Sequence, residues 1–102
     1  MARNVRATHN EQLRDPEIVA EYLSEALKDG DSAVILMALR NIVAAREDGI
    51  AGLAQRSNLG RESVYKMLSA TGNPKLSSFT KLIHGLGLEL KVESNLNHGA
   101  TT

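Results

Sequence analysis

Hydrophobic residues recur every three or four positions through most of this 102-residue chain, the period of a helix with one buried face. The first such stripe follows Asp15-Pro16-Glu17. These residues supply an N-cap, a proline at the first helical position and an acid in the first turn. The stripe ends near Asp29-Gly30 and comprises Ile18, Val19, Tyr22, Leu23, Ala26 and Leu27. We therefore predict a helix over residues 15–29.

Two further stripes predict a second and a fifth helix. The second begins at Asp31 and runs to about Glu47, where Asp48-Gly49 ends it, with a buried seam of Ile35, Leu39, Ile42, Val43 and Arg46. The fifth follows a turn at residues 72–74 and runs from about Leu76 to His84. Its inward residues are expected to be Leu76, Phe79, Leu82, Ile83 and Leu86.

The segment between these stripes, residues 50–68, has the pattern of a helix-turn-helix. Ala54 is small where two helices must approach closely, and Asn58 follows where the chain must turn. Asparagine is the next best residue after glycine for the left-handed backbone that such a turn needs. We expect helices at Ile50–Ser57 and Arg61–Ser69, with Leu59 plugging the turn.

The second helix of this pair is predicted to present a polar face. Val64 and Met67 recur at helical spacing and pin it to the core, which leaves Arg61, Glu62, Ser63, Tyr65 and Lys66 exposed. A sharp turn followed by a polar, partly basic helix fits a DNA major groove. The alternative is an αα-hairpin that only builds a core. Ser57 and Gly60 are departures from the common motif, since an apolar residue and a capping side chain are more usual there.

The hydrophobic period changes to two at the C-terminal end. Leu88, Leu90 and Val92 alternate with charged residues, the pattern of a half-buried strand. A lone strand leaves its backbone groups unpaired, so pairing with a second copy would make a two-fold dimer. An edge folded onto its own chain, or an extended tail, explains the pattern equally well.

Charge is unevenly distributed although the net charge is zero. Residues 1–49 carry six Lys/Arg against nine Asp/Glu, residues 50–87 carry five against one, and residues 88–102 carry one against two. The basic block therefore coincides with the helix-turn-helix pattern, as DNA binding requires. The acidic residues Glu17, Glu21, Glu25 and Asp29 lie four apart on one helix face. That face either docks on a basic partner or is simply solvated.

Several functional classes are disfavoured by composition. The chain has no cysteine, three histidines far apart, and no glycine-rich phosphate loop, so we expect no catalytic site, metal site or cofactor. No apolar run approaches the length of a membrane span and the N-terminus lacks the apolar centre of a signal peptide. We expect a cytoplasmic protein with a flexible arm at 1–14, one domain at 15–93 and a disordered tail at 94–102.

Two stretches resemble a known family: DPEIVAEYLSEALKDGD, and ILMALRNIVAAREDGIAGLAQRSNLGRESVYKMLSATGNPKLSSFTKLIHGLGLELKV. They are similar to addiction-module antidote proteins, the HigA-type antitoxins of the lambda-repressor-like (Xre) helix-turn-helix class. The likeness covers residues 15–92. It is most specific in LGRESVYKMLS and GNPKLSSFTKLIHGLGL.

The resemblance implies an all-α, five-helix lambda-repressor-like domain, to which the residue pattern adds one short C-terminal β-strand. It implies an antitoxin that neutralises a RelE/ParE-like toxin, binds double-stranded operator DNA as a homodimer and represses its own operon. A stand-alone phage-type repressor and a pure protein-interaction domain are the alternatives. Our candidate DNA contacts are Gln55, Arg56, Arg61, Glu62, Ser63, Tyr65, Lys66, Asn73 and Lys75. Our candidate dimer contacts are Phe79, Leu86, Leu88, Leu90 and Val92.

Overall fold

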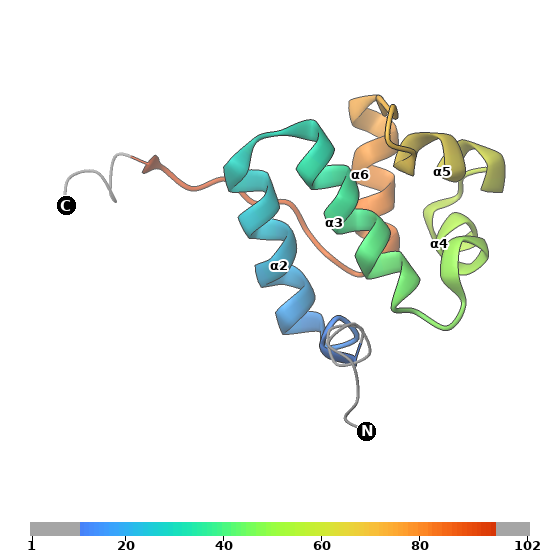
Figure 1. The fold of residues 1–102 in the computed structure, drawn as a ribbon, viewed down its shortest axis with the longest axis horizontal. Helices are drawn as coiled ribbons and strands as arrows, with labels where there is room; N and C mark the ends of the chain where they lie inside the picture. Colours follow the sequence, from blue (N-terminus) through green and yellow to red (C-terminus); the bar gives the residue numbers. More distant parts are fainter. Residues whose placement is uncertain (1–10, 96–102) are drawn as a thin grey trace, which may run out of the picture.

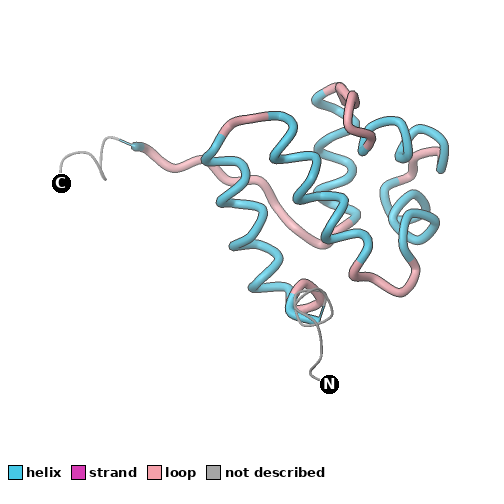
Figure 2. The backbone as a smooth tube through the Cα atoms, viewed as in Figure 1, coloured by secondary structure: helices cyan, strands magenta, loops and turns pink. Residues whose placement is uncertain are grey.

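The computed structural model describes residues 11–95, and the part of the chain that it describes contains five principal α-helices and no β-strand (Figures 1 and 2). The helices are α2 (Pro16–Asp29), α3 (Ser32–Ala44), α4 (Gly49–Ser57), α5 (Arg61–Leu68) and α6 (Leu76–Gly85). The five predicted helices are therefore confirmed, with small shifts of their ends. The predicted strand is absent.

Local capping explains where α2 begins and ends. The Asp15 carboxylate accepts a hydrogen bond from the Glu17 N–H at 2.9 Å, and Pro16 is the first helical residue. Gly30 adopts φ of 79° and donates its N–H to the Ala26 carbonyl. A side chain there would strain the left-handed backbone. The sequence signals at both ends of this helix are thus confirmed.

The helix α3 is the central element, since it packs against α2, α4 and α5 (Figure 1). It ends at Ala44, three residues before the predicted end at Glu47. The next residue, Ala45, is 1% exposed, and its carbonyl accepts a hydrogen bond from Arg14 at 2.7 Å. A continuing helix would use that carbonyl within itself, so the contact with Arg14 favours ending α3 at this point.

The turn between α4 and α5 forms as the sequence predicts. Asn58 has φ of 57° and ψ of 43°, and its N–H bonds to carbonyls of the last turn of α4. The Leu59 N–H donates to the Ala54 carbonyl at 3.0 Å, and Leu59 packs partly buried against the core. A left-handed residue therefore reverses the chain direction between the two helices.

The helix α6 packs on α4 through a small-residue contact. A methyl group on Gly85 would collide with the Ser57 hydroxyl and lie 3.2 Å from Leu53 Cδ1. The buried serine at position 57, a departure from the predicted motif, therefore lies where α6 approaches α4 closely. Leu76 was predicted to face inward, and this prediction is wrong, because the residue is 75% exposed. The buried residues of α6 all lie in its second half, so its first turn projects beyond the core.

The core is aliphatic and draws on all five helices. It also includes Leu13, which is 1% exposed. Residues 11–14 therefore do not belong to the flexible arm predicted for 1–14, and the rest of that arm, like most of the predicted tail, lies outside the described residues. The fully buried large side chains are Leu13, Leu39, Ile42, Leu53, Leu82, Ile83, Val19 and Val64.

The segment after α6 departs from the predicted strand. Leu88 donates its N–H to the Ile83 carbonyl at 3.1 Å, and residues 88–94 then continue without helix or ladder past α2 (Figures 1 and 2). A strand is defined by pairing with another strand, and the described part of this chain offers none.

Candidate nucleic-acid interface

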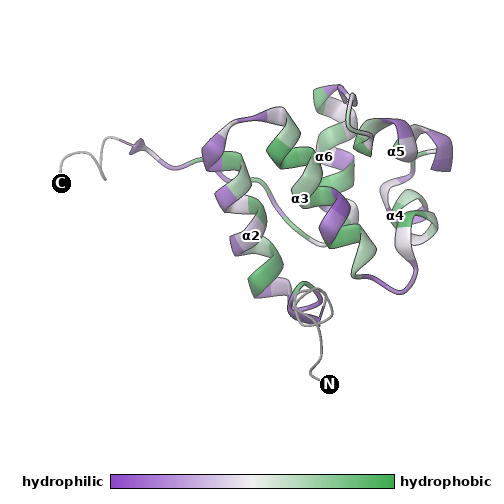
Figure 3. Cartoon of the chain, in the orientation of Figure 1, coloured by the Kyte–Doolittle hydropathy of each residue, from purple (hydrophilic) through white to green (hydrophobic). Residues whose placement is uncertain are grey.

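The outer face of α5 carries the polar side chains singled out by the sequence. Val64, Met67 and Leu68 are buried, whereas Arg61, Glu62, Ser63, Tyr65 and Lys66 are exposed. Figure 3 shows the contrast between hydrophilic α5 and the largely hydrophobic α3. The eight residues of α5 thus divide into a side that packs and a side that is open to a ligand.

The two cationic side chains on this face are unengaged. Within residues 11–95, neither the Arg61 guanidinium nor the Lys66 ammonium makes a side-chain hydrogen bond or ion pair. Gly60, the residue before α5, provides no side-chain cap. The first N–H groups of α5 are therefore left without a capping side chain. Together these groups form a positive, donor-rich helix end.

The other predicted DNA contacts flank this face. Gln55 lies near the end of α4, while Asn73 and Lys75 lie in the turn before α6, and all three are exposed. The structure thus places all nine predicted contacts at the surface, on α4, α5 and the segment that follows α5.

Arg56 differs from the other members of this set. Its Nε donates to the Gly85 carbonyl at 2.9 Å, and its Nη1 pairs with the Asp48 carboxylate. The hydrogen bond from Arg56 holds the pKa of Asp48 below the ordinary value of an aspartate. Arg56 therefore ties α4 to the end of α6 and has fewer donors left for a phosphate.

Three more arginines have structural roles whose acceptors the sequence pattern does not reveal, although that pattern placed Arg46 in a buried seam. Each donates to a backbone carbonyl at or just beyond the end of a helix: Arg14 to Ala45 at 2.7 Å, Arg40 to Leu68 at 2.7 Å, and Arg46 to Leu86 at 3.0 Å. Because the acceptors are backbone atoms 28 or more residues away, no side-chain pattern points to them.

An apolar groove of about 480 Å³ lies beside α5. Tyr65 forms part of its wall, although 58% of the tyrosine is exposed. The Tyr65 side chain therefore borders both the groove and the outer face of α5. The remaining lining residues come from α3 and the segment after it, from α4, and from the end of α5 and the residue that follows it: Arg40, Val43, Ala44, Arg46, Gly49, Ile50, Leu68 and Ser69.

The predicted dimer contacts are distributed less uniformly. Leu86 is 5% exposed and lies in the core of the single chain, while Phe79 and Leu88 are partly buried against it. Leu90 is 40% exposed and Val92 is 99% exposed. Of the five residues, Leu90 and Val92 offer the most surface to a second copy.

The described residues show no group of three or more potential metal ligands. No helix among them has the length and hydrophobicity needed to cross a bilayer.

The family described as "probable addiction module antidote protein" matches residues 5–94. The chain belongs to this antidote family. An uncharacterised protein of Haemophilus influenzae is 34% identical over 85 residues, which cover 83% of this chain and 86% of that relative. No solved structure matches the chain. Membership of an antidote family implies a toxin partner of some kind.

Proposed function

We propose that this antidote-family protein is a DNA-binding antitoxin of the lambda-repressor-like, HigA-type class. In this proposal α4 and α5 are the helix-turn-helix, and α5 enters the major groove of operator DNA. The protein neutralises a RelE/ParE-like toxin and, as a homodimer, represses its own operon. The observation that carries the DNA-binding part is the open, cationic outer face of α5 next to the left-handed turn at Asn58.

The chemistry of this face suits base recognition. Arg61 is the first residue of α5, and the N-terminal part of a recognition helix contacts the base edges. A guanidinium can pair with the O6 and N7 atoms of guanine through two hydrogen bonds. Glu62 can accept from a cytosine amine, whereas Lys66 lies a turn later and suits a phosphate.

We expect Arg61→Ala to weaken binding to operator DNA by about 1–3 kcal/mol and to reduce sequence preference. The measurement is a titration with a duplex taken from upstream of the gene and with a scrambled duplex of the same composition. If the ratio of the two affinities is unchanged in a folded variant, Arg61 does not read the sequence.

We expect Lys66→Ala to weaken binding to both duplexes alike and to lower the slope of log K against log salt by about one. Lys81→Ala is the matched control, because Lys81 is an exposed cation of the same basic block but lies on α6. If Lys81→Ala lowers the slope as much as Lys66→Ala does, the binding reflects overall charge and not the face of α5.

The antitoxin role has a separate test. Co-expression with the small basic protein encoded by an adjoining gene should yield a stable complex and restore growth that the partner alone arrests. If the neighbouring product is harmless and binds nothing, a stand-alone repressor is the better assignment. If the chain binds neither DNA nor a toxin, a pure protein-interaction domain is the better assignment.

A further inference from the structure

The segment that follows α6 has an open backbone edge. After the hydrogen bond between the Leu88 N–H and the Ile83 carbonyl, residues 89–93 make no backbone hydrogen bond within the described part of the chain. The side chains alternate between apolar at 88, 90 and 92 and charged at 89, 91 and 93. Open backbone groups beside exposed apolar side chains form a template for another strand.

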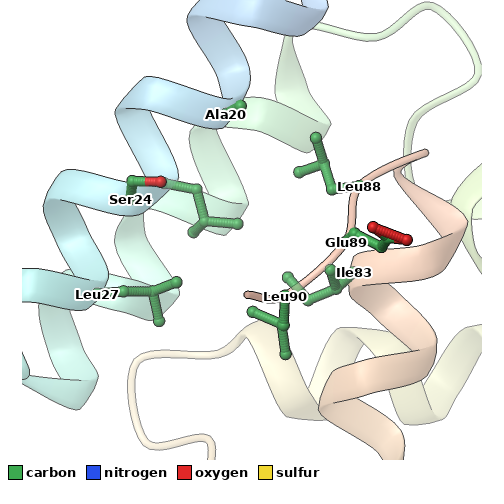
Figure 4. Close-up of a pocket in the computed structure, with 8 residues that line it drawn as sticks. Ala20, Ser24, Leu27, Ile83, Leu88, Glu89 and Leu90 are labelled. Carbon is green, nitrogen blue, oxygen red and sulfur yellow. The ribbon is translucent and has the colours of Figure 1, made fainter. Parts of the chain in front are cut away.

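A small hollow adjoins this edge. It measures about 60 Å³ and lies between α2 and the segment. Figure 4 shows Ser24 and Leu27 of α2 on one side and Leu88 and Leu90 on the other, with the Glu89 side chain pointing away from α2. Val92, 99% exposed, lies just beyond Leu90 along the chain, so the apolar face of the segment is only partly covered by its own protomer.

We infer that a second copy of this chain occupies the edge, with the two segments antiparallel and Leu90 opposite Leu90. In this register Leu88 of each copy faces Val92 of the other, which brings Val92 of the second copy next to the hollow. Glu89 of each copy faces Lys91 of the other. One two-fold axis therefore produces three apolar pairs and two opposite-charge pairs.

Other antiparallel registers are less favourable. Centring the axis on residue 89 or 91 brings Glu89 opposite Glu89 or Lys91 opposite Lys91, and like charges directly opposite destabilise a pair. Centring it on residue 92 pairs Lys91 with Glu93 but places Leu90 opposite Ser94. A shift by a single residue opposes apolar with charged side chains.

Both charged residues of the proposed pairs are available. Glu89 and Lys91 are exposed and take part in no ion pair or side-chain hydrogen bond among residues 11–95. The apolar pattern alone is compatible with a partner of any sequence. The alternation of one acid and one base about Leu90 makes the segment complementary to itself, and this selects a second copy as the occupant.

The test measures self-association of the full chain without DNA, by sedimentation over a range of protein concentrations. We expect Glu89→Lys and Lys91→Glu each to raise the dimer dissociation constant about tenfold, because each change turns two attractive pairs into two repulsive ones. The double variant should return to the wild-type value. Mixing the two single variants should restore dimers, since every charge pair in the mixed dimer is attractive.

Glu93→Lys is the matched control, because it changes charge equally and faces no charged residue in the proposed register. If Glu93→Lys weakens the dimer while Glu89→Lys does not, the register is centred on residue 92 and the inference is wrong. It is also wrong if the wild-type chain is monomeric, if no variant changes association, or if these variants abolish toxin binding only.

This inference deepens the homodimer of the proposed function and rests on it. Its failure is separable from failure of DNA binding, because a chain that dimerises by another face would still pass the duplex titrations. Circular dichroism of each variant checks that the five helices remain, and the restored mixed dimer excludes misfolding as the cause of any loss.

Discussion

Two regions of this molecule use the same kind of side chain in opposite ways. At the ends of α3, α5 and α6, four arginines donate to backbone carbonyls and join segments that are distant in sequence. On the outer face of α5, the Arg61 and Lys66 side chains make no hydrogen bond or ion pair within the described chain. The same charge therefore stabilises the fold in one region and remains available to a ligand in the other.

The physical reason lies in the helix ends. The last carbonyls of a helix lack partners within it and carry the negative end of its dipole. A guanidinium offers several donors in one plane and bonds such carbonyls better than an ammonium does. The arginine at position 46 illustrates this, since it reaches the Leu86 carbonyl at 3.0 Å from the segment after α3. In a small aliphatic core, these bonds fix how the helices meet.

The difference between the two regions is tested most directly by truncating one arginine in each. Arg46→Ala should lower the free energy of unfolding by about 3 kcal/mol, because it removes a charged hydrogen bond and the packing of the side-chain stem. Arg61→Ala should change it by less than about 0.5 kcal/mol. Urea denaturation followed by circular dichroism measures both.

Arg46→Lys serves as the control for charge. It keeps the positive charge but loses the planar donors, so most of the stability loss should remain. Equal unfolding free energies for Arg46→Ala and Arg61→Ala would show that the contacts between the helices depend on apolar packing alone. The two regions would then not differ.

Substituting one glycine in each region gives a second comparison of their stabilities. Gly85→Ala should destabilise by about 2 kcal/mol, because its methyl group collides with the Ser57 hydroxyl at the contact of α4 and α6. Gly60→Ser should instead stabilise by a few tenths of a kcal/mol, since the position before α5 is open and lacks a capping side chain. Thermal unfolding of both variants is the measurement.

Ser57 provides the test of mechanism for that prediction. Its hydroxyl is buried and has no hydrogen-bond partner among the described residues, so Ser57→Ala alone should be neutral or slightly stabilising. Adding Ser57→Ala to Gly85→Ala should recover part of the loss. Simple additivity of the two changes would mean that the collision is not the cause.

The helices could be predicted because their signals are local. Asp15-Pro16 marks the start of α2, and the left-handed Asn58 marks the turn between α4 and α5. The polar face of α5 follows from the spacing of Val64 and Met67 alone. Such features depend on residues within one or two turns of each other, so a single sequence contains the information.

The misjudged features depend on tertiary contacts. Leu76 fits the helical stripe but lies in a turn of α6 that projects beyond the core. Leu86 faces inward, as its spacing predicts, but it packs within its own chain and leaves little surface for the dimer contact that was also expected of it. The strand at residues 88–92 needs a partner that the described chain does not supply. None of these outcomes is encoded in the periodicity, because periodicity does not say which neighbour is present.

The smallest expected effect concerns Arg56, which was predicted to contact DNA and is engaged with Asp48 and Gly85. The hydrogen bond from Arg56 lowers the pKa of Asp48, with a further contribution from the nearby positive charge of the same guanidinium. A carboxyl whose pKa is lower in the folded state contributes stability above its unfolded pKa. That contribution disappears as the pH falls through the folded pKa.

We therefore expect an NMR titration to give Asp48 a pKa below the ordinary range for aspartate, and Arg56→Gln to raise that pKa. Asp48→Asn should remove this part of the acid-induced loss of stability while leaving the hydrogen bond from Arg56 to Gly85 in place. If the Asp48 pKa is unaffected by Arg56→Gln, the guanidinium is not held at this site in solution. Arg56 would then be as available for a DNA contact as Arg61 is.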